Sequence, residues 1–202
     1  MLSRYGCCFL WMSRWKNDCC CDRMGCSVGR QSVLKGNIEP QLSKNLTPQQ
    51  IQLVRSTWSI VSQDMVGVGT IVFQRFLTRH PELCKMFRKF MTLKDDGTYD
   101  WDLEELQRHA LLVMQALEAA IDNLDDSRVL AGILYDLGRR HARYNVQEQM
   151  FDKLWEALRY GLEKSLQNRM TREVNQAWFA VFKYISWQVI KGMRDTYAKG
   201  ID

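Results

Sequence analysis

The sequence predicts an all-α protein. Apolar side chains recur every three to four residues through most of the stretch from residue 46 to 197, which is the spacing of one face of a helix. Only 3 prolines and 12 glycines occur among 202 residues, so few positions interrupt a long helix. Alternating runs typical of strands are absent. The unequal helices and mixed loops also differ from a regular up-and-down four-helix bundle.

The composition divides the chain into two parts, residues 1–45 and residues 46–202. The first part holds six of the seven cysteines and seven basic side chains against three acidic ones, and it shows no sustained helical period. We therefore expect residues 1–45 to be a disordered, flexible, basic and cysteine-rich extension. The second part is nearly neutral, which argues against nucleic-acid binding. No apolar run reaches 18 residues, so no membrane-spanning helix is predicted.

The extension contains a candidate lipidation signal at Met24-Gly25-Cys26. If translation starts at Met24, Gly25 fits the beginning of an N-myristoylation signal and Cys26 becomes an adjacent palmitoylation site. Two acyl chains beside basic residues suffice for stable attachment to an anionic membrane. If Met1 starts the mature chain, myristoylation requires cleavage first. The body shows no disulfide pattern, as is typical of the cytoplasm, so we expect a cytoplasmic protein with peripheral attachment to the plasma membrane.

The body begins with a strong helix-start signal. Thr47 is placed to cap the first helix, Pro48 occupies its first position, and Gln50 completes a capping box. A second helix is expected from about residue 66 to 79, because apolar side chains again recur at helical spacing there. Pro81 then opens a short turn-like helix.

Residues 91–100 are rich in charged side chains and contain a glycine, so we expect a polar loop or a short helix there. Asp100 is placed to cap the next helix, whose inward face carries His109. A polar corner separates this helix from another that ends near His141. Two further helices complete the body, and Thr171 is placed to cap the last of them.

His109 and His141 each lie on an apolar helix face. The chain runs 13 residues from His109 to Asp122 and 15 residues from Asp126 to His141, about 20 Å and 22 Å at the helical rise. If the corner reverses the chain, the two imidazoles return to the same level and can hold a flat ligand between them. Taken alone, either histidine reads more simply as an ordinary core residue. The third histidine, His80, precedes a proline and is expected to be exposed.

The residue inventory narrows what the histidine pair could bind. A zinc site requires three or four ligands, and no third histidine or cysteine is placed with the pair. A di-iron bundle requires Glu-x-x-His motifs on two helices, and these are missing. Phosphate-binding loops and nucleophile–histidine sets are also missing. Porphyrin iron fits, because the macrocycle supplies four ligands and the protein supplies only the axial ones.

The body, from residue 46 to about 197, resembles the globin family, and most closely its neuroglobin and globin X-like members. The resemblance implies a globin fold of seven to eight helices around a haem pocket, with haem b as the cofactor. The stretches that carry it are Leu53-Val-Arg-Ser-Thr-Trp58, Gly69-Thr-Ile-Val-Phe-Gln-Arg75, Pro81-Glu-Leu-Cys-Lys-Met-Phe87, His109-x-x-x-Val113-Met114 and Leu137-Gly-Arg-Arg-His141.

The resemblance also implies roles for individual residues. His141 matches the proximal iron ligand of globins, and His109 matches the distal histidine. The other residues implied to contact the cofactor are Phe87, Val113, Phe73 and Leu137. Globin X-like proteins resemble this chain in their Met-Gly-Cys start as well, which strengthens the lipidation hypothesis at Gly25 and Cys26.

Two functions follow from the resemblance, and a third class remains beside them. The first is a six-coordinate globin that binds O₂ or another diatomic gas and has a redox or signalling role with an electron-transfer partner. Nitrite reduction or superoxide production would then be side activities, and no dedicated enzyme is implied. The alternative is a five-coordinate globin for O₂ storage or transport. The third class is a helical scaffold without haem, since fold alone does not establish a site.

Overall fold

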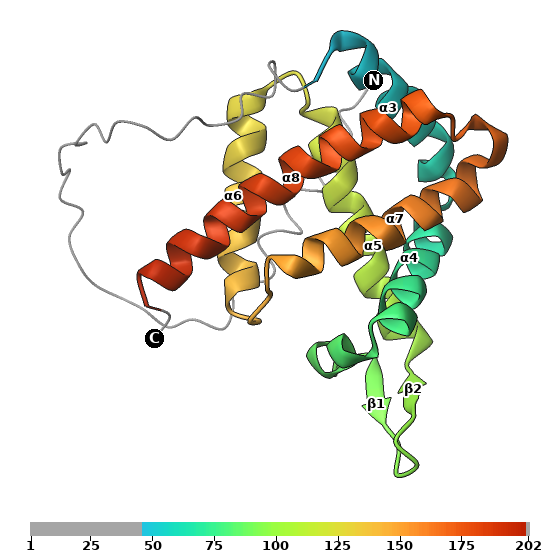
Figure 1. Ribbon diagram of the computed structural model, residues 1–202, viewed down its shortest axis with the longest axis vertical. Helices are drawn as coiled ribbons and strands as arrows, with labels where there is room; N and C mark the ends of the chain where they lie inside the picture. Colours follow the sequence, from blue (N-terminus) through green and yellow to red (C-terminus); the bar gives the residue numbers. More distant parts are fainter. Residues whose placement is uncertain (1–45, 201–202) are drawn as a thin grey trace, which may run out of the picture. The chain divides into compact units, whose positions relative to one another are not determined.

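The computed structural model describes residues 46–200, and it confirms the all-α class (Figure 1). The predicted extension, with Gly25 and Cys26, lies outside the described residues, so its flexibility and its lipidation stay predictions. Within residues 46–200, no helix is both long and apolar enough to cross a membrane. The six α-helices of this part are α3 (Pro48–Val61), α4 (Met65–Arg79), α5 (Leu103–Asp122), α6 (Ser127–Ala142), α7 (Gln149–Leu166) and α8 (Arg172–Ala198).

Short elements connect these helices. Three 3-10 helices of the described residues lie between consecutive α-helices, namely η2 (Ser62–Asp64), η3 (Pro81–Met86) and η4 (Gln167–Arg169). Two strands, β1 (Met91–Leu93) and β2 (Tyr99–Trp101), stand between η3 and α5 and pair in antiparallel fashion.

The predicted helix starts at Thr47 and Thr171 are confirmed. The backbone N–H of Gln50 donates to Thr47 Oγ1 (3.2 Å), and the Gln50 side-chain oxygen accepts from the Thr47 backbone N–H (2.9 Å), which is a complete capping box. Thr171 Oγ1 accepts from the Val174 N–H at 3.3 Å and caps α8. Both signals depend on residues three apart, so the local sequence suffices to specify them.

The prediction of a loop or short helix at residues 91–100 is wrong, because this stretch forms the β1–β2 hairpin. Met91 pairs with Trp101 and Leu93 with Tyr99. Gly97 takes a positive φ of 80° in the connecting turn, which glycine adopts without strain. Strands of three residues are too short to show an alternating pattern, so the charged turn dominated the sequence signal.

The prediction that Asp100 caps α5 is also wrong, and the cap is Asp102. Asp100 belongs to β2, where it pairs with Thr92. The side chain of Asp102 accepts from the Glu105 N–H at 3.1 Å, three residues further on. The cap therefore lies two residues later than expected, and α5 begins as soon as the strand pairing ends.

α6 and α8 pack closely against each other and cross in Figure 1. The contact needs Gly138 of α6 and Gly192 of α8, because a β-carbon on either residue would overlap a backbone carbonyl oxygen of the facing helix. The oxygen opposite Gly138 belongs to Val189, and the one opposite Gly192 belongs to Tyr135. This reciprocal approach holds α6, the helix of His141, directly on the core.

The core between α3 and α8 is built around Trp178. Its side chain is completely buried, and its indole N–H donates to Thr57 Oγ1 at 2.9 Å. The Trp58 ring lies against it, with 6.1 Å between the ring centroids. The apolar faces of α3 and α8 therefore pack against each other. α8 contacts α3 in this way and also packs against α6.

Candidate functional site

His109 of α5 lies inside a cage of three phenylalanine rings. Phe73 of α4 meets the imidazole edge-on at a centroid distance of 4.8 Å, and Phe87 does so at 5.8 Å. Phe90 stands at 5.5 Å with only 35° between the ring planes, which is close to stacking. Such contacts orient a ring without a hydrogen bond. The predicted residues Phe73, Phe87 and His109 are thus brought together, from three separate segments of the chain.

The cage keeps the His109 imidazole neutral. The pKa of His109 is lowered from its usual value of 6.5 to about 4, mainly by burial and to a smaller extent by the positive charges of His141 and Lys89. At neutral pH the ring therefore carries a lone pair on one nitrogen. A neutral imidazole is the form that binds a metal ion.

His141 lies in the last turn of α6 and is held by its own helix. Its Nδ1 is 2.9 Å from the carbonyl oxygen of Leu137. A carbonyl can only accept, so Nδ1 carries the proton and Nε2 keeps its lone pair. Burial lowers the pKa of His141, the bond to Leu137 opposes this, and the charge of Arg140 adds to the lowering. A histidine that donates from one nitrogen while the other stays basic is the usual arrangement of a metal-binding imidazole.

His109 and His141 influence each other's titration, since a positive charge on His141 is one cause, after burial, of the low pKa of His109. They come from α5 and α6, which meet at the predicted polar corner. Asp126 caps α6 there, with its side chain accepting from the backbone N–H of Arg128 (3.2 Å) and Val129 (3.1 Å). The chain turns back at this corner, where α5 ends and α6 begins (Figure 1).

The predicted apolar lining residues are half-buried. Val113 lies on α5 one turn beyond His109, and Leu137 lies on α6 one turn before His141. Both pack against the core while part of each side chain stays accessible. The sequence interpretation missed Phe90, which completes the cage. Its only sequence signal is that it is an apolar residue three positions after Phe87, directly after two basic residues.

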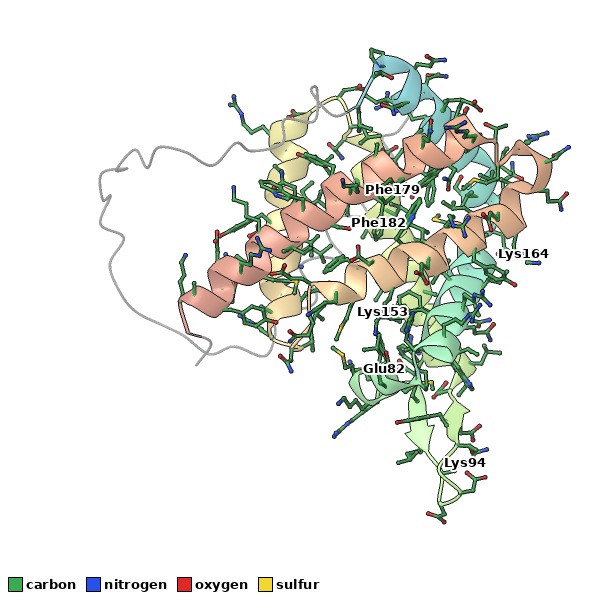
Figure 2. The ribbon with its side chains drawn as sticks, viewed as in Figure 1. Glu82, Lys94, Lys153, Lys164, Phe179 and Phe182 are labelled. Atoms are coloured by element: carbon green, nitrogen blue, oxygen red, sulfur yellow. The ribbon has the colours of Figure 1, made fainter. Side chains whose placement is uncertain are left out.

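The prediction that His80 is exposed is wrong, because only 20% of its side chain is accessible. Its ring packs on Phe76 at 6.0 Å, and its Nδ1 lies 3.6 Å from Glu82. Lys153 of α7 donates to the same Glu82 carboxylate at 2.6 Å (Figure 2). His80 thus belongs to the contact between η3 and α7.

The residues of this site fit a flat, metal-containing cofactor. They offer two neutral imidazoles and apolar side chains. Among residues 46–200, no cluster of three or more His, Cys, Asp or Glu side chains could hold a metal ion alone. A metal bound here therefore has to bring its remaining ligands with it, as porphyrin iron does. The apolar lining suits the hydrophobic faces of a macrocycle.

The cage predicts an acid-dependent stability for the protein without a bound cofactor. The unfolded chain takes up a proton on His109 near pH 6.5, whereas the folded chain resists protonation until about pH 4. The contribution of His109 to the free energy of unfolding is therefore complete above pH 6.5. It is lost as pH falls toward 4, and the loss reaches about 3 kcal/mol. Urea unfolding between pH 7 and 4 measures the loss, and the curve of His109→Leu should be flatter by this amount. Identical slopes for the two proteins would contradict the burial of His109.

Comparison with known proteins shows the family to which the chain belongs. The family model for globins matches residues 70–189. Neuroglobin from Tetraodon nigroviridis is 30% identical over 150 residues, which cover 74% of this chain and 93% of the relative. Neuroglobin from Chaenocephalus aceratus is 30% identical over 157 residues, which cover 77% and 95%.

A solved structure agrees at the level of the fold. The hexacoordinated heme protein from an anhydrobiotic tardigrade superposes with a TM-score of 0.65 at 20% sequence identity, over 74% of this chain and 96% of that one. Together with the matched family model and the relatives that are 30% identical, this superposition identifies the chain as a member of the globin family.

Proposed function

We propose that this globin holds haem b between His141 and His109 and uses it to bind O₂ or another diatomic gas. The observation that carries the proposal is the pair of neutral imidazoles from α5 and α6, one fixed by its own helix and one caged by phenylalanines. Family membership supports haem binding, since globins bind diatomic gases through this cofactor. The roles of the individual residues are our inference from the resemblance to globins, and the local geometry of the two imidazoles is compatible with them.

The two histidines would do different work. Haem iron supplies a binding position for a diatomic gas and a one-electron redox couple. His141 would hold the iron permanently through Nε2, because its Nδ1–H is tied to Leu137 and fixes the plane of the ring. His109 has no such hydrogen bond, and its position rests on ring contacts. It would therefore be able to bind the iron and also to withdraw from it.

We favour a six-coordinate resting state in which His109 occupies the gas-binding position. If the imidazole leaves in only about 1% of the molecules, the apparent affinity for an external ligand falls about 100-fold. Such a protein suits redox or signalling work better than bulk O₂ storage, because an iron bound by two imidazoles needs little ligand rearrangement on electron transfer. The tardigrade protein with this fold is itself described as hexacoordinated, which supports the choice.

Titration of the haem-free protein with haem tests the proposed function. We expect the Soret band of the bound haem to grow until one haem is bound per chain. We also expect the ferrous holoprotein to bind carbon monoxide. A titration of His109→Leu should reach the same stoichiometry, because His141 is the permanent ligand. Failure of the native chain to saturate at one haem would leave a helical scaffold and overturn the proposal.

A further inference from the structure

Asp102 joins the hairpin to the helix of the distal histidine. Its backbone N–H donates to the carbonyl oxygen of Phe90 at 3.1 Å, which closes the base of the hairpin. Its side chain accepts from the Glu105 N–H at 3.1 Å, and its carbonyl accepts from the Leu106 N–H at 3.0 Å. One residue thus ends the strand pairing and starts α5, with no flexible linker between them. His109 follows seven residues later, about two helical turns away.

Phe90 is the second link between the hairpin and His109. The centroid of its ring lies 5.5 Å from that of the His109 imidazole, with 35° between the ring planes. The same ring also contacts Phe87, at a centroid distance of 5.2 Å. Its backbone N–H donates to the Phe87 carbonyl at 3.1 Å, while its own carbonyl accepts from Asp102. The ring that leans on His109 is therefore fixed to the start of the helix that carries His109.

The hairpin itself is built to be stiff. The pairing continues beyond the strands into the turn, where the Lys94 N–H donates to the Thr98 carbonyl at 2.7 Å. Asp96 accepts from both the N–H and the hydroxyl of Thr98, at 2.9 and 2.6 Å. Figure 2 labels Lys94 at the end of the hairpin that points away from the helices. The other end is anchored by Met91, which is buried.

We propose that the hairpin from Phe90 to Asp102 is a positioning element that holds His109 in its aromatic cage and thereby limits how readily the distal histidine leaves the haem iron. The inference rests on the proposed function, since it concerns the same site. It assigns a role to a segment whose sequence predicts only a polar loop.

The His109 imidazole has two states, one in the aromatic cage and one withdrawn from it. An element shifts an equilibrium only if its interactions differ between the states. The contact of Phe90 with His109 exists in the caged state, and the backbone bond to Asp102 keeps Phe90 aligned with α5. When the imidazole withdraws, either the ring contact breaks or α5 shifts against the hairpin base. A stiff hairpin opposes both movements, and an opened one opposes neither.

Two substitutions open the hairpin without touching the cage. Antiparallel pairs alternate between hydrogen-bonded and non-bonded, so the bond at Phe90–Asp102 makes Thr92–Asp100 the next bonded pair. Thr92→Pro removes that N–H, whereas Thr92→Ala keeps it. Gly97→Val strains the turn at φ 80°, whereas Gly97→Asn tolerates this conformation. A β-carbon at Gly97 meets nothing within 4 Å, so backbone strain is the only change.

The test measures carbon monoxide binding to the ferrous holoprotein after flash photolysis, together with its visible spectrum. We expect Thr92→Pro and Gly97→Val to raise the rate limited by His109 departure about fivefold. The split visible bands should weaken in the same variants. Thr92→Ala and Gly97→Asn should behave like the native protein. In the His109→Ala background, opening the hairpin should no longer change the binding rate.

The possible outcomes distinguish a failure of the positioning role from a failure of the proposed function. If the native chain binds haem with two histidines but the opened hairpins bind carbon monoxide at the native rate, the positioning role is overturned and the proposed function stands. An acceleration that persists in His109→Ala would also overturn it, because the effect would then not pass through the distal histidine. A native chain that binds no haem overturns the proposed function first.

Discussion

Replacing His141 with alanine is expected to lower the affinity for haem by more than about 100-fold, because removal of even a supporting group around a metal ligand costs 10–100-fold. His141 is the residue whose Nδ1 is fixed by Leu137 and whose Nε2 is therefore available. His109→Ala, by contrast, should keep the haem and lose only the sixth ligand. Haem transfer to an excess of a haem-free acceptor globin measures both effects as dissociation rates.

A chemical rescue provides the control for this prediction. His141→Gly should recover haem binding when free imidazole is added, since the small molecule can fill the space of the missing side chain. Recovery would assign the loss to the missing ligand and not to a misfolded helix. If His141→Ala instead retained haem as tightly as the native protein, while His109→Ala lost it, the assignment of the two roles would be reversed.

Replacing Gly192 with alanine is expected to destabilise the protein by about 3 kcal/mol, because the new methyl group would overlap the carbonyl oxygen of Tyr135. The neighbour is backbone, so it cannot turn aside as a flexible side chain could. Gly138→Ala should also destabilise the protein, because its methyl group would overlap the carbonyl oxygen of Val189. Urea unfolding of the holoprotein, followed by circular dichroism, measures the loss as a fall in the midpoint.

Gly132 supplies the matched control for the glycine prediction. It lies on α6, as Gly138 does, but a β-carbon there meets nothing within 4 Å. Gly132→Ala should therefore stabilise the protein by about 0.5–1 kcal/mol through helix propensity alone. Equal effects at Gly132 and Gly192 would show that α6 and α8 are not in backbone contact. Because α6 carries His141, we also expect Gly192→Ala to speed haem loss.

The parts of the structure that could be predicted from the sequence are those encoded by residues close together in the chain. The capping box at Thr47 and the cap at Thr171 are read from residues three apart, and the apolar stripes from one helix at a time. The positions of His109 and His141 followed from the same local counting, because helix rise is constant. The resemblance to globins then named Phe73 and Phe87 as pocket residues, and both rings contact His109.

The missed features depend on contacts between distant segments. The glycines at the α6–α8 crossing look like ordinary helix interruptions until the two helices are placed together. Phe90 contributes to the cage only because the hairpin returns the chain to the start of α5. The hairpin escaped prediction because each strand has three residues and its turn is highly charged. Tertiary packing, and not local propensity, decides these positions.

The visible spectrum of the deoxygenated ferrous holoprotein tests the central claim, which is that His141 and His109 hold the haem iron from its two faces. Histidine on both faces gives a low-spin iron with sharp, split bands, and this is the spectrum we predict. His109→Ala should convert it to a single broad band, as expected of a five-coordinate iron. A single broad band in the native protein would contradict the account and assign the chain to five-coordinate O₂ storage or transport.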